Sequence, residues 1–184
     1  MKGKTMKKLF LVILLLVIFY GCEHKKIQPR LPATEKIENI PNYIIKGFNL
    51  TTTDEGVKKT ELKAESAQVF EMKKMIFAQK LEMINHEKDG GKTILNADSA
   101  VINTENNSFK ATGNVKIYAS NGTVIITESI FWDDVKKKVL GEGPVTVIKD
   151  KNVINGIGFE SDVDMRDVRI NKKVKFKAKD IVQE

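Results

Sequence analysis

Few of the side chains that carry enzyme chemistry occur in this sequence of 184 residues. Its only histidines are His24 and His86, and its only cysteine is Cys22. A zinc site needs a cluster of such ligands, and nucleophilic catalysis needs a base held beside the nucleophile. No serine has a histidine and an acid in a suitable pattern, and no glycine-rich phosphate loop is present. The sequence therefore predicts a protein that is not an enzyme and needs no metal or cofactor.

Cys22 is the one reactive residue whose surroundings indicate a modification. It follows an apolar run from Leu9 to Tyr20, which four lysines precede. Twelve helical residues rise about 18 Å, which is short of a hydrocarbon core of about 30 Å. The run is typical of a secretory signal, and Gly21 with Cys22 resembles the lipobox of bacterial lipoproteins, although Phe19 departs from its pattern. Residues 1–22 are thus a signal peptide with a lipidated cysteine or a retained anchor helix, or Cys22 has no role.

A second set of reactive side chains recurs along the chain as an acidic residue followed by serine. The pairs begin at Glu65, Asp98, Glu128 and Glu160, with spacings of 33, 30 and 32 residues. Carboxylates can bind metal or transfer protons, but such regular spacing is typical of a structural repeat. We therefore expect the pairs to mark equivalent strand starts in successive repeats.

The segments after these pairs alternate with period two, which predicts β-strands. Each repeat holds a second strand after a polar turn, and these second strands are residues 81–84, 115–118, 145–148 and 174–178. Residues 62–83 have helix-forming composition, but their register in the repeat predicts strand there too. Paired strands repeated in order predict an all-β fold, either a twisted antiparallel jelly roll or a solenoid-like stack. Residues 23–42 hold three of the four prolines and are expected to form an extended tether before a domain over 43–184.

The positive charge of the chain does not indicate nucleic-acid binding. Of the formal charge of +7, four charges lie before the apolar run, and the remaining lysines are scattered.

Six segments in order resemble LptC, the periplasmic bridge component of the lipopolysaccharide-export ABC transporter. They are residues 59–70, 95–100, 111–117, 122–128, 144–147 and 154–159. The resemblance implies a β-jelly roll at the bacterial inner membrane that faces the periplasm. It also implies that lipopolysaccharide from the ABC transporter passes through an apolar groove into a soluble jelly-roll partner, docked edge to edge at the C-terminal end. Most members of this family retain a transmembrane helix, from which the lipobox-like cysteine departs.

The inward positions of the predicted strands are the candidate groove. We expect it to be lined by Val115, Ile117, Val124, Ile126, Ile130, Val145, Val147, Ile157, Phe159 and Phe176. The same residues would equally suit the closed core of a structural envelope lipoprotein. The alternation of lysine and apolar residues at Val174, Lys175, Phe176 and Lys177 predicts either the partner-docking edge or a charge-protected edge strand. A lipidated relative of the soluble bridge protein, held at the outer membrane, is a third alternative.

Overall fold

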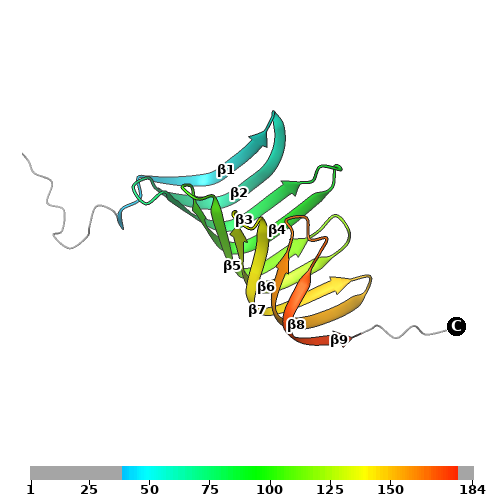
Figure 1. Cartoon of the computed structure of the whole chain (residues 1–184). Coiled ribbons are helices and arrows are strands. Elements are labelled where there is room, and N and C mark those ends of the chain that lie inside the picture. The colour runs from blue at the N-terminus through cyan, green and yellow to red at the C-terminus, as the bar shows by residue number, and fades with distance from the viewer. Residues whose placement is uncertain (1–38, 178–184) are drawn as a thin grey trace, which may run out of the picture. The chain divides into compact units, whose positions relative to one another are not determined.

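A computed structural model describes residues 39–177 of the chain, which form one sheet of nine antiparallel strands (Figure 1). The strands are β1 (Tyr43–Asp54), β2 (Val57–Phe70), β3 (Met75–His86), β4 (Lys92–Asn103), β5 (Ser108–Tyr118), β6 (Val124–Asp133), β7 (Lys138–Lys149), β8 (Asn152–Ser161) and β9 (Arg169–Lys177). Each strand pairs with its neighbours in the chain, so the order in the sheet is the order in the sequence. The all-β prediction is confirmed, and residues 62–83 lie in β2, β3 and their turn despite their helical composition.

Each repeat of the sequence is one long hairpin, because two strands and two turns consume about thirty-two residues. The turn chemistry fits this arrangement. Asp89, Gly90 and Gly91 join β3 to β4, where Gly90 has a φ of 89° and Asp89 accepts a hydrogen bond from the Gly91 amide at 3.1 Å. Asn121 does the same in the turn before β6, where its side chain accepts a hydrogen bond from the Thr123 amide at 2.9 Å. Short polar turns therefore alternate between the two long margins of the sheet.

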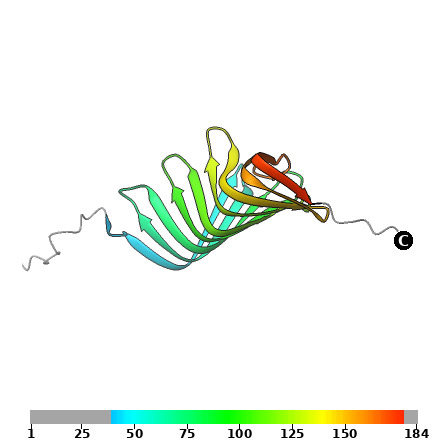
Figure 2. The ribbon, with the colours of Figure 1, turned by 90° about the horizontal axis from the view of Figure 1, so that it is seen from below.

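The strands bend near their middles, and the bends fold the sheet into two facing walls (Figure 2). From β4 to β9 the strand registers shift at these points, as between Thr112 and Val115 of β5, whereas the β2–β3 and β3–β4 pairs keep one register. Residues with positive φ sit at the shifts, including Gly113 at 81° and Asn114 at 49°. A β-bulge of this kind inserts an extra residue and increases local bending. The result is a trough whose floor is the line of bends and whose mouth lies between the two margins.

Three of the acidic-serine pairs lie near the middle of their strands, and the fourth, Glu160 and Ser161, lies at the end of β8, so the prediction that the pairs mark strand starts was wrong. Glu65 is in the middle of β2 and Asp98 in the middle of β4. Asp98 accepts a hydrogen bond from the Asn114 side chain at 2.7 Å, and Glu65 pairs with Lys80 at 2.9 Å. The carboxylates thus brace neighbouring strands on the outer side of the bend. The second strands predicted in the repeats proved to be parts of longer, bent strands, as residues 81–84 are of β3 and residues 115–118 are of β5.

Candidate lipid-carrying interior

One row of inward side chains crosses the whole sheet and is apolar on every strand. Successive members are register partners on adjacent strands, from the β1 edge to the β9 edge. The apolar row consists of Leu50, Leu62, Met83, Leu95, Ile117, Ile125, Val147, Ile154 and Phe176. Cross-strand neighbours on one face lie about 4.5–5.5 Å apart, so nine of them form a continuous apolar strip along the stack.

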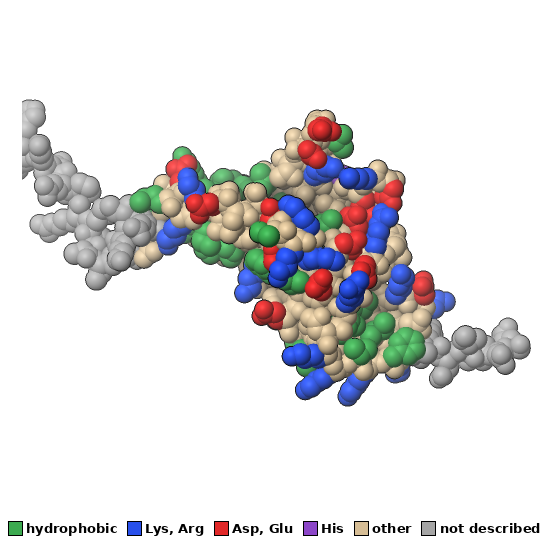
Figure 3. Space-filling model, viewed as in Figure 1, with side chains coloured by type: hydrophobic (Ala, Val, Ile, Leu, Met, Phe, Trp, Pro, Cys, Tyr) green, Lys and Arg blue, Asp and Glu red, His purple; other side chains and the backbone are tan. Residues whose placement is uncertain are grey.

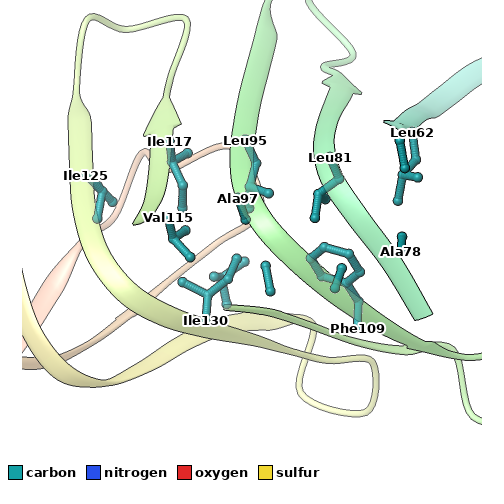
Figure 4. Close-up of a cluster of buried hydrophobic side chains, with 14 of the residues drawn as sticks. Leu62, Ala78, Leu81, Leu95, Ala97, Phe109, Val115, Ile117, Ile125 and Ile130 are labelled. Atoms are coloured by element: carbon teal, nitrogen blue, oxygen red, sulfur yellow. The ribbon is translucent and has the colours of Figure 1, made fainter. Parts of the chain in front are cut away.

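The facing wall carries a second apolar row, and its side chains are small over four strands. Ala67, Ala78, Ala100 and Ala111 are successive register partners on β2 to β5, and Ile130 continues the row on β6. All five are buried. Figure 4 shows side chains from both walls gathered in a common interior. The two rows give the trough an apolar lining on both sides.

Six of the predicted groove residues lie in this interior. Val115, Ile117, Ile130, Val145, Val147 and Phe159 are all buried members of the apolar cluster. Burial places their side chains inside the trough. Contact with lipid stays a prediction for each of them.

Two residues of β6 that were predicted to line the groove do not face the interior. Ile126 is 37% exposed, whereas its neighbour Ile125 is fully buried, and Val124 is only partly buried. The prediction assumed that every second residue from Val124 to Ile130 faces the interior. The register shift between Thr127 and Phe131 breaks this alternation, so that Ile125 and Thr127 face inward before the bend and Ile130 after it.

The sequence contains a signal for this change in which residues face inward, and the prediction did not use it. At three acidic-serine pairs, the residue before the acid and the residue after the serine are both buried. These inward pairs are Ala64 and Ala67, Ala97 and Ala100, and Thr127 and Ile130. The acid and the serine together occupy the point where the alternation resets by one residue. The strand register shifts there at Asp98 and at Glu128, but it does not shift at Glu65. The fourth pair differs, because Ser161 is itself fully buried.

Ile157 and Phe176 are less buried than the six predicted lining residues of the buried cluster. Ile157 is only partly buried and is paired with the exposed Pro144, outside the buried cluster. Gly158, with a φ of 70°, is where the phase changes on β8. Phe176 pairs with Ile154 and so belongs to the apolar row, but it is 62% exposed at the sheet edge.

The C-terminal edge is open over the residues expected to dock a partner. Val174 and Phe176 are exposed, as are Lys175 and Lys177 between and beyond them. In Figure 3, apolar side chains are visible beside the point where the described chain ends. β9 pairs with β8 on one side, and within residues 39–177 no strand pairs with its other side.

A loop between β8 and β9, which we call the strap (residues 162–168), contacts turns on the opposite margin. Arg166 pairs with Glu87 at 2.8 Å and with Asp89, and Asn85 donates to Asp164 at 3.0 Å. The Glu87 side chain is inaccessible to solvent, and Thr93 and Ser120 also donate to it at 3.0 and 2.9 Å.

The pKa of Asp164 in the strap shifts in the opposite direction to the pKa values of Glu87 and Asp89 in the β3–β4 turn. Burial alone would raise the pKa of Glu87, but hydrogen bonds from Arg166, Ser120 and Thr93 outweigh it and lower that pKa. Arg166 also lowers the pKa of Asp89. Burial raises the pKa of Asp164, and repulsion from Glu87 and Asp162 adds to it.

Of the two histidines and the cysteine, only His86 lies within the described residues. His86 lies 2.8 Å from Glu61 at the end of β3, while His24 and Cys22 fall outside the described residues. Within residues 39–177, no group of three or more His, Cys, Asp or Glu side chains is arranged to hold a metal ion. The same range contains no helix long and apolar enough to cross a bilayer.

The fold and its interior define a class of protein, a wound β-jelly roll with an apolar lining that runs from one open edge to the other. The family model "Lipopolysaccharide-assembly, LptC-related" matches residues 9–178, and the chain belongs to this family. It is therefore a component of lipopolysaccharide transport with its domain in the periplasm, and not an enzyme.

A solved structure supports the fold independently. The structure of LptH, described as the LptA homologous periplasmic component of the lipopolysaccharide transport device from Pseudomonas aeruginosa, matches with a TM-score of 0.51 and 13% identity. The match covers 66% of this chain and 95% of that chain. No curated protein matches the sequence.

Proposed function

We propose that this protein is a membrane-anchored bridge that receives lipopolysaccharide from an inner-membrane ABC transporter and passes it to a soluble jelly-roll partner. The observation that carries the proposal is the apolar row, which is unbroken over all nine strands. A closed core needs apolar residues at its centre, but it does not need them to continue onto an exposed edge strand. The row does continue there, at Phe176.

The chemistry of the row suits a passing acyl chain. Each methylene removed from water contributes about 0.8 kcal/mol, and this gain does not depend on direction. An acyl chain that moves by one strand exchanges one aliphatic contact for a similar one. The lining therefore holds a lipid out of water without fixing it at one position.

The N-terminal segment supplies the anchor in this proposal. Residues 1–22 act as a signal peptide that leaves a lipidated Cys22, or as a retained helix, and residues 23–42 form the tether to a domain over 43–184. Either form holds the trough at the inner membrane, where the transporter releases its substrate.

The β9 edge is the exit in this proposal. Its unpaired backbone groups can add to the edge strand of another jelly roll, which would extend the trough into the partner. Val174 and Phe176 would continue the lining, while Lys175 and Lys177 would flank the junction.

Site-specific photocrosslinking tests the proposal in cells that make lipopolysaccharide. A photoreactive residue replaces Ile117 or Val147 in the interior, and Lys116 serves as the matched outward control on the same strand. We expect an ATP-dependent lipid adduct at both inward positions and none at Lys116. Absence of an adduct in a folded, membrane-bound protein would reject lipid transport.

A second candidate function is that of a structural envelope lipoprotein with a closed core. The observation that favours it is the nearly complete burial of Val115, Ile117 and Ile125. An adduct-free interior, together with failure of the protein to co-purify with an ABC transporter, would support this alternative.

A further inference from the structure

The mouth of the trough is bridged by the strap, and we propose that the strap is a releasable clamp whose Met165 holds the place of a lipid acyl chain. The inference rests on the proposed transport function and adds to it a device that opens and closes the interior. It also assigns a role to residues 162–168, which no strand pairing requires.

The strap crosses from one margin of the sheet to the other. Turns of a simple meander alternate between margins, so the β8–β9 loop starts on the margin of the β2–β3 and β4–β5 turns. Its contacts, however, are with Glu87 and Asp89 in the β3–β4 turn and with Asn121 in the β5–β6 turn. A loop that starts on one margin and binds turns on the other must span the mouth between them.

The contacts that hold the strap to the opposite margin do not include the hydrogen bonds that pair the strands. Arg166 binds Glu87 and Asp89 through its guanidinium, and Asp164 accepts from the Asn85 amide. Asn121 donates from its side chain to the Met165 carbonyl at 3.3 Å. Within the described residues, no backbone-to-backbone hydrogen bond joins the strap to these turns. Release therefore breaks side-chain contacts and leaves every strand ladder intact.

The strap is also braced by its own hydrogen bonds. The Asp162 carboxylate accepts from the Arg166 amide at 2.8 Å and from the Asp167 amide at 3.3 Å, and the Asp162 carbonyl accepts from the Met165 amide at 3.3 Å. These bonds lie within the loop and do not depend on the opposite margin. We therefore expect the strap to detach as a unit rather than to unravel.

Met165 is the apolar part of the clamp. It is 3% exposed and packs with the buried cluster that includes Ile117 and Ile125. Methionine is unbranched and flexible, with a polarizable thioether, so it fills an apolar space much as the end of an acyl chain would. An entering acyl chain can replace these contacts, and the net cost of opening is then confined to the polar attachments.

A cross-link across the mouth tests whether the strap must release. The side chains of Asn85 and Asp164 approach within 3.0 Å, so the two thiols of the double variant N85C/D164C lie within reach of a short bis-methanethiosulfonate reagent, which joins the strap to β3 and which a reductant removes. The matched control T146C/N155C joins side chains 2.8 Å apart on the paired strands β7 and β8. Both are made in the full-length, membrane-bound protein that carries the photoreactive residue at Ile117, with native Cys22 retained.

We expect cross-linking of the strap pair to abolish the ATP-dependent lipid adduct at Ile117 and reductant to restore it, while cross-linking of the control pair changes nothing. An undiminished adduct in the cross-linked strap pair would overturn the inference. Loss of the adduct in the cross-linked control pair as well would show a general effect of cross-linking and would also overturn it.

A second measurement separates this inference from the transport function. Met165→Cys is labelled with a maleimide before and after addition of purified lipopolysaccharide, with the parental chain as the baseline for Cys22 and Ala111→Cys as a buried control. Faster labelling at position 165 alone supports release of the strap even where no transport adduct is seen. If lipopolysaccharide leaves the labelling rate unchanged, the strap is a fixed part of the fold.

Discussion

At the scale of single residues, a side chain's contribution to the fold depends on which side of a bulge it occupies. Ile125 and Ile126 are chemically identical neighbours, yet Ile125 is fully buried and Ile126 is 37% exposed. Ile125 pairs with both Ile117 and Val147 in the apolar row. Ile126 instead pairs with Lys116 and Thr146, whose side chains face outward.

This contrast gives a matched pair of substitutions. Ile125→Ala removes buried methyl groups and leaves a cavity, so we expect it to lower the free energy of unfolding by about 2–5 kcal/mol. Ile126→Ala removes similar atoms from a half-exposed site, and we expect a loss of less than about 1 kcal/mol. Urea unfolding of both variants measures the difference. Equal losses would contradict the inward assignment of Ile125.

Gly113 is a second residue whose role follows from its backbone. Its φ of 81° lies in the left-handed region, and a Cβ there would lie 2.7 Å from the Asp98 carboxylate. We expect Gly113→Ala to lower the free energy of unfolding by about 1–3 kcal/mol, because left-handed backbone and steric overlap both disfavour it. Gly143→Ala is the control, since a Cβ at Gly143 meets nothing within 4 Å. A thermal melt in which both variants match the parent would show that the bend tolerates a side chain.

At the scale of elements, the repeat predicted which segments form strands but not how they bend. The second strands of each repeat, such as residues 115–118, lie within observed strands, because a period of two persists locally. The positions of the bulges were not predicted, because the acidic-serine pair was interpreted as a strand start. The pair instead marks a point where the alternation of inward and outward side chains resets. The strap was also beyond prediction, since its contact between Arg166 and Glu87 joins residues 79 positions apart.

The strap gives a prediction about pH. The pKa values of Glu87 and Asp89 are lowered by Arg166, so their stabilising contribution is present above their ordinary values of 4.5 and 3.8 and is lost as pH falls through the lowered values. Asp164 acts in the opposite sense: its raised pKa favours the fold at low pH, and this contribution is lost as pH rises from 3.8 through the raised value. Asp162 and Arg166 are the other charged groups that face this cluster.

Glu87→Gln isolates the first of these contributions. At pH 7 we expect it to lower the free energy of unfolding by about 1–3 kcal/mol, because hydrogen bonds to a charged, buried partner are weakened. As the pH falls through the lowered pKa of Glu87, the difference from the parent should shrink because Glu87 itself becomes protonated. The urea unfolding midpoints of the variant and the parent, taken at a series of pH values from 7 downward, measure this difference. A difference that does not change with pH would mean that Glu87 acts through packing rather than charge.

At the scale of the whole molecule, the order of strands in the sheet sets an order along the apolar row. The row begins at Leu50 and Leu62 near the N-terminal edge and ends at Ile154 and Phe176 at the β9 edge. Neighbours in the sheet are also neighbours in the sequence. A lipid that moves along the row from the N-terminal edge must therefore pass the strands in the order of the chain. A bridge that loads at one edge and delivers at the other should therefore fill in chain order.

Time-resolved photocrosslinking tests this order. With a photoreactive residue at Leu62 or at Ile154, we expect the lipid adduct at Leu62 to rise first after ATP is added, because β2 lies near the N-terminal edge, where we propose that lipid loads, and β8 lies near the proposed exit at β9. Lys63, exposed beside Leu62, is the matched control and should give no adduct. Removal of the soluble partner should leave the adduct at Ile154 high, since lipid then has no acceptor beyond β9. Simultaneous labelling at both positions would indicate that lipid enters from the side along the mouth, and earlier labelling at Ile154 would reverse the proposed direction of transport.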